Sequence, residues 1–120
     1  MLKYLAVPYS HQSRRVENAR AKQAAILAGK LIKEGNHIIC PVVMCHPMNR
    51  LVGLGGKFEY WREFDELMLS VCFELWVAQF DGWKDSVGIT AEIRMAERRG
   101  MTIRYVNPAT LALAREPFAI

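Results

Sequence analysis

The segment Ser86-Val87-Gly88-Ile89-Thr90-Ala91-Glu92 places a hydroxyl, a glycine and a carboxylate at the start of a predicted helix. The first backbone N–H groups of a helix attract anions, and the Ser86 hydroxyl adds a donor. Gly88 permits a close backbone approach or a positive φ. A carboxylate near a helix N-terminus is expected to stay ionised at neutral pH, so Glu92 is a candidate nucleophile, or stabiliser of positive charge, at an acetal-like carbon. The alternative is a surface glutamate favoured by the helix dipole.

Two histidines and a tryptophan in the predicted loops could also contact a ligand. His46 could donate a proton to a leaving group, and His11 is a similar but more exposed candidate; the alternative for each is a turn histidine without a role. Trp83 could stack on a base or pack in the core. Cys40 and Cys45 with His46 lack the fourth ligand and the paired spacing of a zinc site, so no metal is expected.

These residues are positioned by alternating strands and helices. Apolar runs predict strands, and apolar residues at three- and four-residue steps predict amphipathic helices. Pro41 is placed at the end of the second strand or at a sheet edge, and residues 45–56 are predicted to be a long loop whose glycines give flexibility. Asp65 and Glu66 are expected at the surface or in an interface. The predicted strands are 2–7, 37–44, 73–80 and 101–105, and the predicted helices are 14–34, 60–71, 87–99 and 107–115.

This alternation predicts an α/β fold, a single domain over residues 1–120 with a four- to five-stranded parallel sheet and helices on both faces. In such sheets ligands bind beyond the carboxyl ends of the strands, near the point where the strand order reverses. The loops at 8–13, 44–56 and 81–90 are therefore expected to meet at the site.

Composition and charge exclude several classes of protein. With 52% hydrophobic and 23% charged residues, the 120-residue chain is neither disordered nor a disulfide-stapled mini-protein. No apolar run reaches the roughly 18 residues of a membrane span, and three cysteines are best explained as reduced thiols in a cytoplasm. The net charge of +4 comes from scattered residues, so a nucleic-acid partner is not expected.

Three motifs resemble the nucleoside 2-deoxyribosyltransferase-like superfamily, and in particular its small phage and bacterial members of unassigned function. The motifs are Tyr4-Leu5-Ala6-x-Pro8-Tyr9-Ser10, Leu75-Trp76-Val77 and Gly82-Trp83-x-x-Ser86-x-Gly88-x-x-x-Glu92. The resemblance implies a flavodoxin-like three-layer fold and chemistry at an N-glycosidic bond. The superfamily's glutamate attacks the anomeric carbon, a role that falls on Glu92. Tyr4 matches the tyrosine that orients this carboxylate; its alternative is a core aromatic.

Ser86 stands where the nucleotide hydrolases of the superfamily carry a serine and the nucleoside transferases an aspartate. A neutral hydroxyl tolerates a phosphate that a carboxylate would repel, which favours a nucleotide substrate. Two positions differ from the relatives: Phe73 replaces an acidic residue, and the first-loop arginine of the hydrolases is missing. The candidates to replace that arginine are Ser10, His11, Arg14 and Arg15.

The sequence thus predicts an N-glycosidase for a small (deoxy)nucleoside 5′-monophosphate that needs no cofactor. Glu92 and Tyr4 are the predicted catalytic residues, and the resemblance implies a homodimer or larger oligomer with the helix at 60–71 as a candidate interface. The alternatives are a non-catalytic nucleotide sensor or sequestering module, a nucleoside 2-deoxyribosyltransferase, and a phosphoribohydrolase, whose Pro-Gly-Gly motif is absent. The predicted substrate contacts are Pro8, Tyr9, Ser10, His11, His46, Trp83, Ser86 and Gly88.

Overall fold

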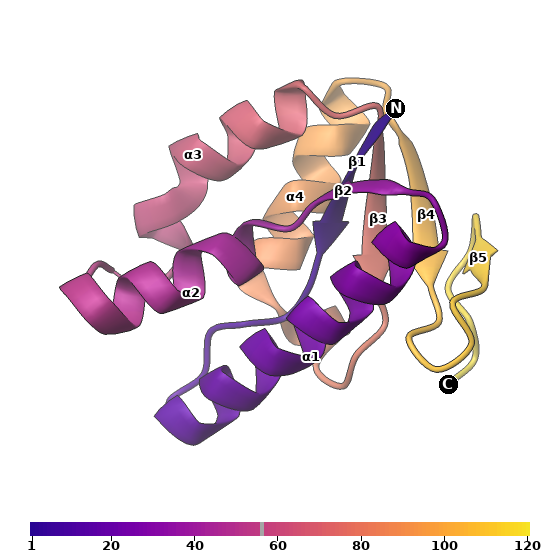
Figure 1. Ribbon diagram of the computed structural model, residues 1–120. Helices are drawn as coiled ribbons and strands as arrows, with labels where there is room; N and C mark the ends of the chain where they lie inside the picture. The colour runs from indigo at the N-terminus through magenta and orange to yellow at the C-terminus, as the bar shows by residue number, and fades with distance from the viewer. Residues whose placement is uncertain (56) are drawn as a thin grey trace.

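The computed structural model, which describes residues 1–55 and 57–120, is a three-layer α/β fold (Figure 1). Helices and strands alternate along most of the chain, as predicted. In chain order the elements are β1 (Leu2–Ala6), α1 (Arg14–Lys33), β2 (His37–Ile39), α2 (Pro41–Val52), α3 (Phe58–Ser70), β3 (Glu74–Ala78), the 3-10 helix η1 (Trp83–Asp85), α4 (Val87–Arg98), β4 (Thr102–Val106) and β5 (Leu113–Ala114).

The sheet has the order β2-β1-β3-β4-β5. The first four strands are parallel, and β5 pairs antiparallel with β4. The chain moves outward from β1 to β2 and then returns to the other side of β1 as β3. The strand order therefore reverses between β1 and β3, the position at which open α/β sheets bind ligands.

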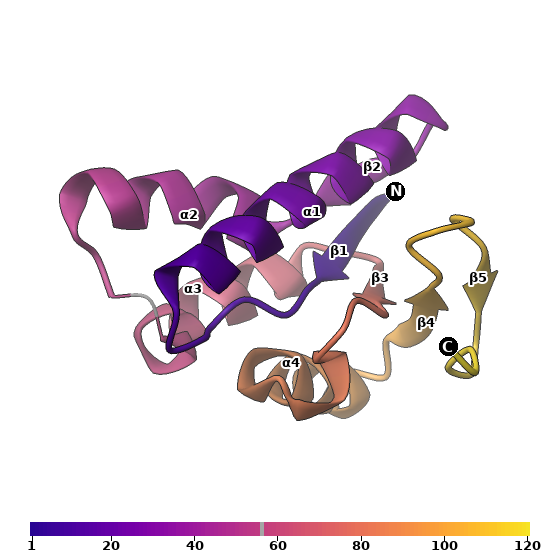
Figure 2. The same cartoon turned by 90° about the horizontal axis from the view of Figure 1, so that it is seen from below.

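Alternating side chains along β1 and β3 separate two hydrophobic cores, because successive strand residues point to opposite faces. Leu5 and Trp76 belong to a core with α1, whereas Tyr4 and Leu75 belong to a core with α3 and α4. Figure 2 shows α1 and α4 on opposite sides of the strands. The predicted layers are confirmed, and Glu92 on α4 lies on the same side as Tyr4.

The segment after β2 is the main departure from the predicted elements. The predicted strand at 37–44 ends at Ile39, and α2 occupies most of the predicted loop at 45–56. Pro41, at the start of α2, has the φ that a first helical turn needs. Pro41, Cys45 and Asn49 follow at four-residue steps and form the buried face of α2. The helix ends at Gly53, whose φ of 75° is left-handed, and Gly56 lies outside the described residues.

The predicted helix at 107–115 is also wrong. The Asn107 side chain accepts the backbone N–H groups of Ala109 and Thr110 and so forms a turn instead of capping a helix. Leu111 has a φ of 66°, which a helix does not allow, and the chain then reverses into β5. Beyond β5, the buried amide of Gln79 bonds both the N–H and the C=O of Phe118, at 2.8 and 3.0 Å.

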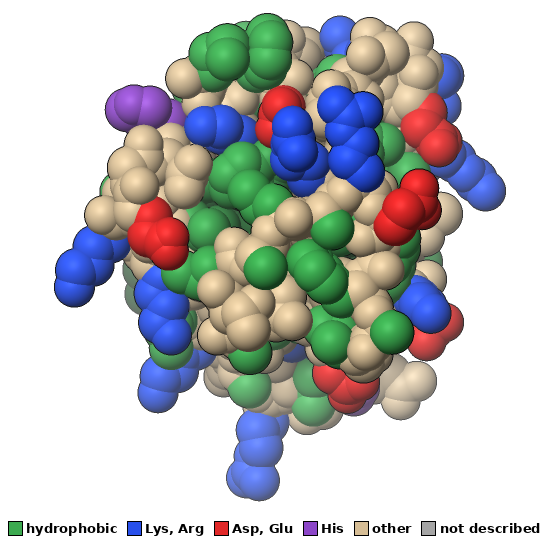
Figure 3. Space-filling model, turned by 90° about the vertical axis from the view of Figure 1, so that its right-hand side faces the viewer, with side chains coloured by type: hydrophobic (Ala, Val, Ile, Leu, Met, Phe, Trp, Pro, Cys, Tyr) green, Lys and Arg blue, Asp and Glu red, His purple; other side chains and the backbone are tan. Residues whose placement is uncertain are grey.

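None of the helices in the described part of the chain is long and apolar enough to cross a bilayer. The face at the β5 edge shows basic and acidic side chains interspersed around a hydrophobic patch (Figure 3). Charges mixed in this way do not form the single-sign stripe that a nucleic-acid backbone requires on this face.

Candidate active site

A cavity of about 720 Å³ opens beyond the carboxyl ends of the strands. Its walls come from the loop after β1, the first two turns of α1, the inner faces of α2 and α3, and the start of α4. This volume lies in the range of small-molecule sites. The loops after β1 and β3 meet here as predicted, but the third wall is helical because residues 41–52 form α2.

Glu92 lies in the second turn of α4 and is 7% exposed. The hydroxyl of Tyr4, which is fully buried behind it, donates a hydrogen bond to Glu92 Oε2. Burial raises the pKa of Glu92 to about 8, the Tyr4 hydrogen bond lowers it, and the charge of Asp65 raises it again. The expectation of a carboxylate ionised at neutral pH is therefore wrong for the ligand-free protein, because burial outweighs the helix N-terminus.

Asp65 is a second carboxyl group in the cavity. It is 8% exposed, its Oδ1 has no hydrogen-bond partner among the described residues, and burial raises its pKa to about 7. Its expected surface position is wrong. The apolar face of α3 repeats every four residues at Trp61, Asp65 and Leu69. A carboxylate on this inward face is the sequence feature that could have predicted the buried position of Asp65.

The charge of Asp65 acts on Glu92 across the cavity wall that both residues line. The charge of Asp65 raises the pKa of Glu92, since ionisation of one group opposes ionisation of the other. With both pKa values raised, the pair holds at least one proton near neutral pH. A cavity with this pair contains one group that can attack or stabilise a cationic carbon and one that can give or take a proton.

The raised pKa values predict that the folded protein loses stability as the pH rises. Glu92 and Asp65 titrate at about 8 and about 7 in the fold, against ordinary values of 4.5 and 3.8. Between these limits the native state binds more protons than the unfolded state, so the free energy of unfolding falls by up to about 1.4 kcal/mol per pH unit for each group. Urea unfolding from pH 5 to 8.5 measures this slope. Glu92→Gln should flatten it, whereas the exposed control Glu97→Gln should not; an unchanged slope in Glu92→Gln would contradict the buried titration.

Ser86 and Gly88 form the end of the cavity at the start of α4. The Ser86 Oγ accepts the N–H of Ile89 at 3.2 Å and so caps the helix, while its own hydroxyl hydrogen stays available to a ligand oxygen. Gly88 does not need a positive φ; a Cβ there would lie 3.3 Å from the Phe58 ring. The close approach of α3 therefore explains why position 88 is a glycine.

Arg20 and Lys57 are cations of the cavity wall, and the sequence reasoning missed both. Arg20 Nη1 donates to the Ser10 carbonyl at 3.0 Å, and its Nη2 lies 2.7 Å from where a Cβ on Gly82 would stand. Gly82 has a φ of 87°, which favours glycine, and a side chain there would also collide with the Arg20 guanidinium. Arg14 and Arg15 do not line the cavity. Arg20 lies three residues after Glu17 on the same face of α1, and this spacing is the sequence feature that could have placed it in the cavity wall.

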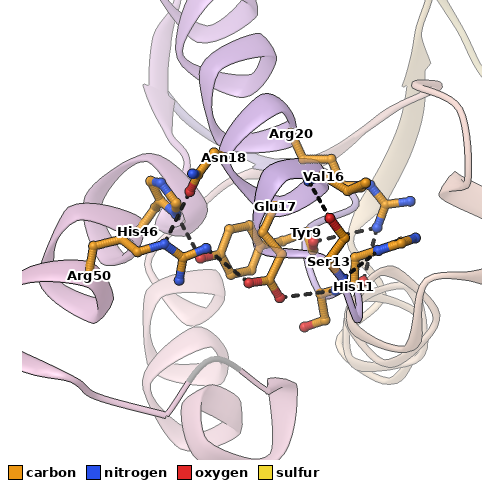
Figure 4. Close-up of polar contacts among 10 residues, drawn as sticks. Tyr9, His11, Ser13, Val16, Glu17, Asn18, Arg20, His46 and Arg50 are labelled. Carbon is orange, nitrogen blue, oxygen red and sulfur yellow. Dashed lines mark hydrogen bonds and ion pairs between the residues drawn. The ribbon is translucent and has the colours of Figure 1, made fainter.

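A polar network holds the loop after β1 against α2 (Figure 4). Tyr9 Oη and His46 Nδ1 are 2.7 Å apart. Glu17 accepts the backbone N–H of His11 at 3.0 Å and pairs with Arg50 at 3.1 Å. Burial lowers the pKa of His46, and the charge of Arg50 lowers it further, so the neutral form of the ring is favoured. Tyr9, Ser10, His11 and His46 all line the cavity.

Two predicted substrate contacts do not line the cavity. Pro8 is fully buried in the core, and the ring of Trp83 packs edge-on against Tyr105, with 5.6 Å between the ring centres. Tyr4 is also behind the wall and reaches the site only through Glu92. Among the described residues no three His, Cys, Asp or Glu side chains are grouped as metal ligands.

The family model described as Domain of unknown function (DUF1937) matches residues 2–107. The chain belongs to this family. None of the curated proteins searched matches the chain significantly. The DUF1937 match runs from β1 to the end of β4, so it includes every residue of the cavity wall and ends before β5.

Proposed function

We propose that this DUF1937 protein is an N-glycosidase that acts on a small (deoxy)nucleoside 5′-monophosphate. The observation that carries the proposal is the pair of buried carboxyl groups, Glu92 and Asp65, in one nucleotide-sized cavity, with the Tyr4 hydroxyl bonded to Glu92. The resemblance of the sequence motifs to the nucleoside 2-deoxyribosyltransferase-like superfamily supports the same chemistry.

The reactive form of the pair has Glu92 ionised and Asp65 protonated, and it is the less populated of the two singly ionised forms because the pKa of Glu92 lies above that of Asp65. The Tyr4 hydroxyl and the N-terminus of α4 both stabilise the Glu92 anion, whereas Asp65 Oδ1 has no partner among the described residues and can carry the proton. Glu92 bonds to C1′ as the C1′–N bond breaks, and the departing base takes the proton of Asp65. Water then attacks C1′, returns a proton to Asp65 and releases Glu92, giving free base and sugar phosphate.

Two ends of the cavity bind the rest of the substrate in this proposal. The Ser86 hydroxyl, the backbone at Gly88 and the Arg20 guanidinium hold the 5′-phosphate, since a helix start and a cation both favour an anion. Tyr9 and His46 are then on the side of the base. Glu92, in the second turn of α4 with its carboxyl group bonded to Tyr4 of β1, faces the sugar.

Base release from a panel of nucleotides and nucleosides tests the function. We expect free base from 5′-monophosphates and at least about tenfold lower kcat/KM for the corresponding nucleosides, because a charged hydrogen bond to the phosphate is lost. Arg20→Met should lower kcat/KM for the 5′-monophosphate more than for the nucleoside and so reduce this preference, and the exposed Arg15→Met is the matched control.

The alternative functions give different products in the same assay. Saturable binding without free base would support the non-catalytic sensor, and transfer of the sugar to an added second base would support a deoxyribosyltransferase. No release and no binding with any nucleotide would overturn the nucleotide assignment altogether.

A homo-oligomer is part of the proposal because the resemblance implies one. Large apolar side chains are exposed on the two helices that flank the cavity: Leu51 and Val52 on α2 are 85% and 73% exposed, and Leu67 on α3 is 60% exposed. A second copy of the chain that covers them would bury apolar area beside the site.

A further inference from the structure

Asn49 places an unsatisfied amide oxygen in the wall of the cavity. It lies on the buried face of α2, is 4% exposed, and its Oδ1 has no hydrogen-bond partner among the described residues. A buried amide oxygen without a partner is costly, and such atoms in a binding cavity are explained when a ligand supplies the donor. The donor that fits is an N–H group.

The neighbouring side chains fix which end of this amide faces inward. The Asn49 side chain hydrogen-bonds the Tyr9 hydroxyl and thereby lowers the Tyr9 pKa, although burial raises it more. An amide that acts in this way donates through Nδ2, so the Tyr9 hydroxyl gives its own hydrogen to His46 Nδ1, 2.7 Å away. In this arrangement Oδ1 is the end of the amide that is left to accept a donor from a ligand.

Asn49 interacts with Tyr9, which the proposed function places on the side of the base. It is one turn along α2 from Cys45, and both residues line the same cavity as Asp65. A sugar at Glu92 with its phosphate at Ser86 therefore directs its base toward α2.

We infer that Asn49 determines the base specificity of the cavity and selects a nucleobase with an exocyclic amino group, such as adenine or cytosine, over its oxo counterpart. The inference rests on the proposed nucleotide site. An amino group satisfies the fixed Oδ1, whereas a carbonyl oxygen at the same place repels it and leaves it unpaired. Tyr9 is a positioning residue, because it acts through the amide of Asn49.

The test measures binding by titration calorimetry in the Glu92→Gln background, where turnover does not interfere. The ligands are two matched pairs, dAMP with deoxyinosine 5′-monophosphate and dCMP with dUMP. We expect the amino member of at least one pair to bind roughly 10- to 100-fold more tightly. Asn49→Leu, which keeps the volume but removes the acceptor, should bring the ratio toward one. Tyr9→Phe should lower it as well, and Asn36→Leu, at an asparagine outside both the cavity and the polar network of Figure 4, should leave it unchanged.

A ratio near one in the parent, a ratio that survives Asn49→Leu, or no binding of any of the four nucleotides would overturn the inference. Amino-selective binding without base release by the wild-type protein would overturn the glycosidase but leave the role of Asn49 standing. Base release at equal kcat/KM from both members of each pair would support the glycosidase but overturn the role of Asn49.

Discussion

Glu92→Gln is expected to reduce base release at least about 1,000-fold while the protein stays folded. The amide fills the same space but cannot bond to C1′ or balance a positive charge there. Folding should not suffer, because a pKa of about 8 leaves Glu92 mostly neutral at neutral pH and the amide is neutral as well. The measurement is kcat for base release from the best nucleotide, together with thermal unfolding at neutral pH.

Glu97→Gln is the control, since Glu97 lies on the same helix and is exposed. Its kcat should equal that of the wild type. If Glu92→Gln released base at the wild-type rate, Glu92 could not be the attacking group, and the glycosidase mechanism would be lost with it.

Asp65→Asn is expected to reduce kcat about 100-fold or more for substrates whose base must be protonated as it leaves. The variant keeps the shape of the side chain but removes the transferable proton. The alkaline limb of the kcat–pH profile should disappear with it, because that limb reports ionisation of the second member of the pair. The measurement is kcat between pH 5 and 9.

A substrate with a good leaving group separates this role from a structural one. 4-Nitrophenolate leaves without protonation, so a 4-nitrophenyl 2-deoxyriboside 5-phosphate should lose much less activity in Asp65→Asn than a nucleotide does. Glu66→Gln, on the adjacent half-exposed residue, should affect neither substrate. Equal losses for both substrates would show that Asp65 shapes the cavity without moving a proton.

The layers and the position of Glu92 followed from local patterns in the sequence. The apolar runs of β1 and β3, the long amphipathic α1 and the cap at Ser86 are contained in single segments. They predicted the strand ends, the helix start and the loops that meet there. The Tyr4–Glu92 contact joins residues 88 positions apart, and only the motif resemblance suggested it.

The parts that were missed depend on competition between local preferences and packing. Val42 and Val43 favour a strand, but Pro41 starts a helix whose buried face then packs beside α1. Asp65 and Asn49 are polar residues on the inward faces of their helices. Hydrophobic periodicity identifies apolar residues on such faces and so does not predict that a polar residue is buried there. The pKa of Glu92 depends on burial, which no single segment reveals.

The C-terminal segment affects the solubility of the protein, because β5 pairs with β4 and the Gln79 amide hydrogen-bonds the backbone of Phe118. A bare outer strand is a template on which strands of other molecules can add, and sheets grow into aggregates by that route. β5 occupies part of that edge, and the Gln79 amide takes the N–H and C=O of Phe118 as a neighbouring backbone would. The segment beyond the family match therefore shields the sheet from fibre-like growth without touching the cavity.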